Sequence, residues 1–204
     1  MLGGLFRKKP RSLERQLRDL ADCGVKLAPD ILPDTVLKQL ANEDADDNLF
    51  ADWSRGAFEK EPYRLLLVAL GDPDATRATN ILHFDTECIE DHGDYVKIAD
   101  HMRTMAGDVL PLTDVEDLVD LEANEAWLSF KLDGVERRWS CEVADDWIDP
   151  KILSQFATLL EGRRTGRRFT YLDLGGQDCI LGCFAEDELK KLRKVTGLAW
   201  EWLK

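Results

Sequence analysis

The stretch "AWLSFKLDGVERRWSCEV", residues 126–143, constrains the fold more than any other part of the chain. Asp133-Gly134 lies between two runs of alternating apolar and polar residues, and this dipeptide favours a two-residue hairpin turn. With that turn, Lys131 lies directly opposite Glu136, and an opposite-charge pair across a ladder is favourable. The sequence therefore predicts a β-hairpin with a defined register.

The register predicts which face of the hairpin is buried, because successive side chains of a strand point to opposite faces. Four side chains are expected to face the core: Leu128, Phe130, Trp139 and Cys141. The other face is polar except for Trp127. That tryptophan either lies beneath another helix or anchors a partner, and both alternatives stay open at this point.

The other segments mix helices and strands. Capping residues and apolar spacing predict helices over 12–24, 33–40, 94–107, 149–162 and 185–197. Asp94 and Asp149 are the expected N-caps of two of them. The apolar run over 63–71 predicts a strand buried on both faces, and residues 80–89 predict another. We therefore expect an α+β fold in which a mostly antiparallel sheet of hairpins has helices packed on it.

A second hairpin is expected around Gly175-Gly176, but its simplest register contains a conflict. A two-residue turn there would place Asp173 opposite Asp178, and like charges across a ladder are destabilising. Either the loop is longer, for example from Leu174 to Gln177, or a cation such as an arginine of residues 163–168 lies nearby.

We divide the 204 residues into an N-terminal helical segment with an acidic loop, residues 1–60, and an α+β domain, residues 61–204. One continuous domain is the alternative. The acidic loop is expected over 41–56. The basic start of the chain, residues 1–12, does not have the order of a secretory signal and is expected to be a tail.

All three histidines lie between residues 83 and 101, among carboxylates. In a strand, His83, Asp85 and Glu87 share a face, and with His92 nearby they could bind zinc, manganese or iron. A metal-dependent enzyme centred on these four residues is therefore one hypothesis. The competing interpretation is a polar strand end that meets solvent before the next helix. Since the spacing matches no specific metal motif, we expect no metal, no cofactor and no catalytic residue.

Two long stretches of the chain contain no lysine or arginine. Residues 78–96 carry five carboxylates and residues 104–130 carry seven, in a chain whose net charge is −13. Such a surface favours a basic protein partner and opposes binding to nucleic acid or an anionic membrane. The expected partner-binding residues are Asp117, Asp120, Glu122, Glu125 and Trp127. Solubility alone is the plainer explanation of the acidity.

The five cysteines have no disulfide or zinc spacing, which is typical of reduced thiols in a cytoplasmic protein. No stretch approaches the ~20 apolar residues of a membrane helix. The oligomeric state is left open.

Four motifs, "HFDTECIEDHGDY", "LDGVERRW", "DDWIDPKIL" and "RRFTYLDLGGQDCILG", resemble those of uncharacterised bacterial proteins that look like small acidic immunity proteins of toxin systems. The resemblance covers about residues 60–197 and includes no catalytic residues. It implies a non-catalytic protein-binding module that inhibits a basic toxin or effector.

Overall fold

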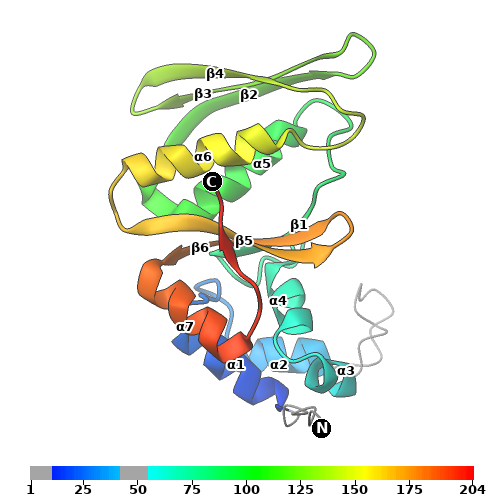
Figure 1. Cartoon of the computed structure of the whole chain (residues 1–204), viewed down its shortest axis with the longest axis vertical. Coiled ribbons are helices and arrows are strands. Elements are labelled where there is room, and N and C mark those ends of the chain that lie inside the picture. The colour runs from blue at the N-terminus through cyan, green and yellow to red at the C-terminus, as the bar shows by residue number, and fades with distance from the viewer. Residues whose placement is uncertain (1–10, 42–54) are drawn as a thin grey trace, which may run out of the picture.

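The computed structural model describes residues 11–41 and 55–204, and it has four layers. Figure 1 shows, from top to bottom, a three-stranded sheet, two helices, a four-stranded sheet and a second layer of helices. Both sheets are antiparallel. The predicted α+β class is therefore confirmed, although the strands form two sheets where the sequence predicted one.

The helices are α1 (Leu13–Asp22), α2 (Pro33–Ala41), α3 (Arg55–Lys60), α4 (Arg64–Gly71), α5 (Asp94–Ala106), the short 3₁₀ helix η1 (Gly107–Val109), α6 (Pro150–Gly162) and α7 (Glu186–Thr196). The strands are β1 (Ile81–Asp85), β2 (Leu112–Asp120), β3 (Glu125–Leu132), β4 (Val135–Cys141), β5 (Arg167–Gly175), β6 (Asp178–Ala185) and β7 (Glu201–Trp202).

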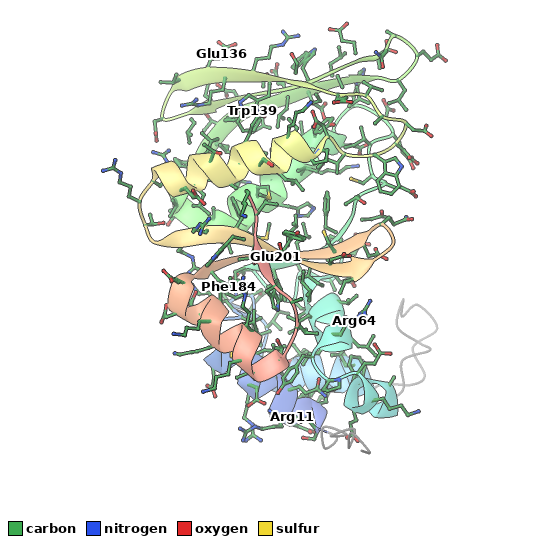
Figure 2. All side chains as sticks on the ribbon, viewed as in Figure 1. Arg11, Arg64, Glu136, Trp139, Phe184 and Glu201 are labelled. Atoms are coloured by element: carbon green, nitrogen blue, oxygen red, sulfur yellow. The ribbon has the colours of Figure 1, made fainter. Side chains whose placement is uncertain are left out.

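The hairpin β3–β4 has the predicted register. Leu128 pairs with Trp139 and Lys131 pairs with Glu136 across the ladder. Trp139 lies between β4 and α6 (Figure 2), where its ring centroid is 4.8 Å from that of Phe130 and 5.0 Å from that of Phe156. The indole is half-buried, so its contribution to stability is smaller than that of a fully buried tryptophan.

Strand β2 was not predicted from the sequence, and its irregular pairing explains why. The register with β3 shifts between Thr113 and Glu116, and Asp114 has a positive φ of 49°. A bulge of this kind interrupts the two-residue alternation by which strands are recognised. Aspartate and glutamate are also uncommon in strands, so their abundance in β2 weakened the signal further.

The four-stranded sheet has the order β1-β6-β5-β7 and is buried on both faces. Leu181 and Phe169 point into the upper core, which α5 and α6 share with the three-stranded sheet. Phe184 and Leu172 point into the lower core, which α1, α2, α4 and α7 help to form. Figure 2 shows Phe184 on the α7 side of this sheet.

The second hairpin avoids the predicted charge conflict by a bulge. Asp173 pairs with Cys179 while Gly175 pairs with Asp178, so Leu174 is the extra residue and the turn is Gly176-Gln177. The Asp173 carboxylate accepts a hydrogen bond of 2.7 Å from the N–H of Gly175. The turn itself still has two residues, one position later than expected. The bulge at Leu174, and not the longer loop that we expected, separates Asp173 from Asp178.

The predicted strand over 63–71 is wrong, because these residues form α4. Every residue from Leu66 to Gly71 is buried. A short helix that is apolar on all sides has the same sequence pattern as a strand buried on both faces. Gly71 brings α4 against the backbone of β1, since an added Cβ would lie 2.5 Å from the nitrogen of His83.

Helices α1, α2, α5, α6 and α7 fall where the sequence predicts helices. Ser12 and Asp149 cap α1 and α6 with their side chains, as expected. The predicted N-cap of α5 is one residue too late: Gly93 is the cap, and Asp94 is the first helical residue. Asp94 instead accepts hydrogen bonds from the N–H groups of Glu90 and Asp91, which precede it.

The lower core contains side chains from both sides of the predicted boundary at residue 60. Leu17 of α1 and Phe184 of β6 belong to the same apolar cluster. The division into two parts stays a prediction. Most of the predicted acidic loop (41–56) and of the basic start (1–12) lies outside the described residues.

Candidate functional site

Three acidic segments meet at one end of the upper half of the molecule, and together we call them the acidic end. They are residues 86–94, 117–125 and 142–149, which in Figure 1 lie on the right, at the N-terminal ends of α5 and α6. The N–H of Ile89 bonds to the carbonyl of Asp146, and the N–H of Ile148 bonds to the carbonyl of Thr86, both at 2.9 Å. These bonds join the first segment to the third.

Side chains join the first segment to the second. Nδ1 of His92 accepts a hydrogen bond of 2.9 Å from the N–H of Val119. The carboxylate of Asp117 accepts bonds from the N–H groups of Gly93, at 2.7 Å, and Val96, at 3.2 Å. Asp117 therefore caps the N-terminus of α5, where backbone N–H groups lack partners within the helix and a negative charge is favourable.

The acidic end has unneutralised charge. Each segment lies within a stretch without lysine or arginine: 78–96, 104–130 and 139–150. Seven of its carboxylates are exposed, and one of them, Glu142, is paired with Lys151 at 2.9 Å. The other six are those of Glu90, Asp91, Asp120, Glu122, Glu125 and Asp145. None of these six forms an ion pair with a residue that the structure describes. Asp120 even pairs with Glu125 across the ladder, a like-charge arrangement that costs stability.

The predicted partner-binding residues lie in three different environments. Asp120, Glu122 and Glu125 are exposed in and beside the β2–β3 turn. Asp117 is half-buried and occupied as a helix cap. Its carboxylate is thus committed to the fold.

Trp127 lies apart from the acidic end, on the outer face of the three-stranded sheet. The guanidinium of Arg138 lies over its ring, 3.9 Å from the centroid, and Leu118 is its cross-strand neighbour. No described helix covers this face (Figure 1). The half-buried state of the indole thus comes from its neighbours in the sheet, not from a helix above it.

Sequence reasoning missed Trp147, which is 41% exposed within the acidic end. It pairs with Glu87 and with Ala144 in isolated β-bridges, so it lies between the first and third segments. The available signal was its position between the pair Asp145-Asp146 and the N-cap Asp149. An exposed tryptophan among carboxylates is an unusual surface feature, because large aromatic side chains are mostly buried.

The histidine–carboxylate cluster does not converge. Nδ1 of His92 accepts a hydrogen bond from the N–H of Val119, and Nε2 of His83 lies 3.3 Å from the carboxylate of Asp178. The Asp85 carboxylate bonds to the N–H of Glu87 and to the amide of Gln177. Within residues 11–41 and 55–204, no three His, Cys, Asp or Glu side chains are placed to hold a metal ion. The side chains of the hypothesised metal site therefore do not come together in these residues.

Thiol chemistry has little support in the same region. Burial raises the pKa of Cys88 to about 12, with smaller contributions from Asp85 and Asp94. The thiol is therefore protonated at neutral pH and is a poor nucleophile. All five cysteines are free thiols.

The arginine-rich segment 163–168 has the opposite character to the acidic end. Arg163 bonds to Asp133 at 2.6 Å, and Arg168 bonds to Glu161 at 2.6 Å. Arg168 also lies over the ring of Trp202, 4.6 Å from the centroid. These arginines are neutralised by side chains of the same chain.

Comparisons with known proteins identify no relative: no family model, no curated protein and no solved structure matches this chain. Among the described residues, no helix is both long and apolar enough to span a bilayer.

Proposed function

We propose that this protein is a non-catalytic binding module that holds a basic partner protein at its acidic end. In the immunity-protein form of this proposal, the partner is a basic toxin or effector whose active site is blocked. The observation that carries the proposal is the gathering of three base-free segments at one end, with six exposed carboxylates that have no ion-pair partner among the described residues.

The arrangement of carboxylates at the acidic end favours binding of a cation and does not stabilise the free protein. Asp120 and Glu125 repel each other across the ladder, so their closeness is unfavourable in the free protein. A cationic partner would remove that repulsion. Because unlike charges attract over about 10 Å at 0.1 M salt, the acidic end would also accelerate association.

Trp147 supports a specific contact, since charge alone gives little shape selectivity. Aromatic side chains are enriched among residues that contribute most to protein interfaces. With 41% of its surface exposed, Trp147 has area left to bury, and the surrounding carboxylates would form a polar rim. It replaces Trp127 as the aromatic anchor of the proposal.

We propose that the protein is cytoplasmic. Five free cysteines, three of them buried, are compatible with a reducing compartment, where thiols stay reduced.

Site-specific crosslinking tests the proposal. The variant Trp147→p-benzoylphenylalanine should crosslink a basic protein in the cells from which the chain comes. The matched control is Val135→p-benzoylphenylalanine, because Val135 is 59% exposed and lies beside the β3–β4 turn, at the other end of strand β3 from the acidic end. It should not crosslink that protein.

The purified partner should then bind the wild-type chain with a salt-dependent association rate. Equal crosslinking from both positions, or an acidic partner, would contradict the proposal.

A further inference from the structure

The free edge of β1 borders a groove whose opposite wall is α5. Leu82, His83, Phe84 and Asp85 line it in sequence, facing α5 residues at helical spacing: Asp94, Lys97, Ile98 and His101. The hollow has a volume of about 230 Å³. A second hollow of about 370 Å³ shares Pro73, Leu82 and His101 with it. A groove between a strand edge and a helix suits an extended peptide that adds to the sheet.

Two backbone hydrogen bonds show which backbone groups of β1 face this groove. The N–H of Cys183 bonds to the carbonyl of Asn80 at 3.0 Å, and the N–H of Thr86 bonds to the carbonyl of Gln177 at 3.1 Å. In an antiparallel ladder, every second residue bonds to the partner strand. Leu82 and Phe84 therefore bond to β6, while the odd-numbered residues turn their N–H and C=O groups to the free edge.

Two of these residues are accessible. His83 is half-buried and Asp85 is exposed, whereas Ile81 is only 3% exposed. No described residue bonds to the N–H or C=O groups of His83 and Asp85. The edge thus offers two donors and two acceptors in the spacing of a strand.

The edge of β1 also lacks the usual protection against pairing. Native sheets blunt their edges with lysine, proline, bulges or covering segments. Strand β2 has a bulge, β4 carries exposed charged residues, and β7 covers the edge of β5. Residues 81–85 contain no lysine, arginine or proline, and they pair with β6 without a register shift.

The side chains around the groove indicate the chemistry of its occupant. Asp85, Asp94 and Asp100 line the two hollows. Asp94 and Asp100 already form ion pairs, with Lys97 at 2.8 Å and with Arg103 at 3.0 Å. Asp85 is the carboxylate of the three without an ion-pair partner among the described residues. Leu82 and Ile98 supply apolar surface. The imidazole of His101 has no hydrogen-bond partner among the described residues, and its burial lowers its pKa. A neutral imidazole can both donate and accept a bond to a peptide backbone.

We propose that an extended, lysine- or arginine-bearing segment of the basic partner adds to the four-stranded sheet along His83–Asp85, in the groove beside α5. This inference rests on the proposed function, which supplies the basic partner. The segment bonds to the free N–H and C=O groups of the edge, and a basic side chain of the segment faces Asp85.

A pair of variants at one position separates strand addition from charge attraction. Asp85→Pro and Asp85→Ala both lose the carboxylate, but only Asp85→Pro loses the edge N–H. The probe is a short synthetic peptide of alternating lysine and valine with blocked ends, titrated calorimetrically into the intact chain. We expect Asp85→Pro to bind at least about tenfold more weakly than Asp85→Ala, with equal thermal stability of the two variants confirming that both fold.

A second measurement needs no change to the protein. The same peptide with an N-methyl group at every residue keeps its charge but cannot donate a backbone hydrogen bond from either edge, so it should not bind. The unmodified peptide should slow hydrogen exchange at the amides of His83 and Asp85.

Two results would overturn strand addition. One is equal binding of the peptide by the two Asp85 variants together with equal binding of the methylated peptide. The other is no binding of the unmodified peptide by the wild-type chain. Neither result touches the crosslinking at Trp147, so failure of the groove and failure of the proposed function are distinguishable.

Discussion

The acidic end and the arginine-rich segment 163–168 are both strongly charged, but they use their charges in different ways. Arg163, Arg167 and Arg168 each form an ion pair with a carboxylate of another element or turn. At the acidic end, carboxylates bond mainly to backbone N–H groups: Asp117 to Gly93, Asp91 to His92 and Asp120 to Ala123.

This difference decides which region projects a field. An ion pair cancels most of its own potential within a few ångströms, so the arginines mainly hold elements together. A carboxylate that bonds only to an N–H group keeps its full charge. The acidic end, where such carboxylates are gathered, can therefore steer a charged partner.

The largest effect is expected at Asp117, a carboxylate of the acidic end that stabilises the fold. Asp117→Ala removes the acceptor of two N–H groups at the start of α5 and should cost about 1–2 kcal/mol of unfolding free energy. Denaturant unfolding measures this cost. Glu116→Ala is the control, because Glu116 is exposed on the outer face, and it should change little. Equal costs for the two variants would place Asp117 among the free carboxylates.

Removing one ion-paired arginine of segment 163–168 should lower the unfolding free energy. Arg167 bonds to Glu188 and to the carbonyl of Cys183, so Arg167→Ala should cost about 1 kcal/mol. Arg164 is exposed and forms no ion pair with a described residue, and Arg164→Ala should stay within about 0.5 kcal/mol of wild type. If both variants are neutral, the arginines do not hold the fold.

Neutralising carboxylates that have no ion-pair partner should raise the stability of the protein. The double variant Asp120→Asn, Glu125→Gln removes the like-charge pair across the ladder and should gain roughly 0.2–1 kcal/mol at low salt. Thermal unfolding at low and high salt measures this gain, which should shrink as salt screens the repulsion. A salt-independent loss of stability would show that these carboxylates serve the fold.

The smallest effect concerns acid stability at Asp94. Burial would raise the pKa of this carboxyl, but the hydrogen bond from Lys97 and those from the N–H groups of Asp91 and Glu90 outweigh burial and lower it. A lowered pKa in the folded chain contributes stability above the unfolded value, about 3.9. That contribution is lost as the pH falls through the folded value.

Asp94→Asn should therefore lose part of this pH dependence. Unfolding free energies measured from about pH 5 downward would show wild type and variant converging as the pH falls below about 4. Parallel curves for the two proteins would contradict the assignment of Asp94.

The sequence predicted those parts of the fold where local chemistry is unambiguous. The Asp133-Gly134 turn determined a complete register, and Ser12, Asp149 and Gly107 marked helix ends that the structure contains. It failed where two structures share one pattern, as in α4, and where a bulge broke the alternation, as in β2.

The acidic stretches could be recognised from the sequence, but their assembly could not. The Ile89–Asp146 and His92–Val119 bonds join residues far apart in the chain, and no local pattern encodes them. For the same reason Trp147 was missed and Asp117 was assigned to binding, since its helix-capping role depends on how α5 packs beside β2.

Association kinetics with the crosslinked partner test the central claim most directly. For wild type, raising salt from about 50 to 500 mM should slow association by about tenfold or more, with a smaller change in dissociation. The variant Asp120→Asn, Glu122→Gln, Glu125→Gln, Asp145→Asn should show the slow rate already at low salt while unfolding normally. An association rate indifferent to both salt and these four neutralisations would mean that the acidic end does not bind the partner.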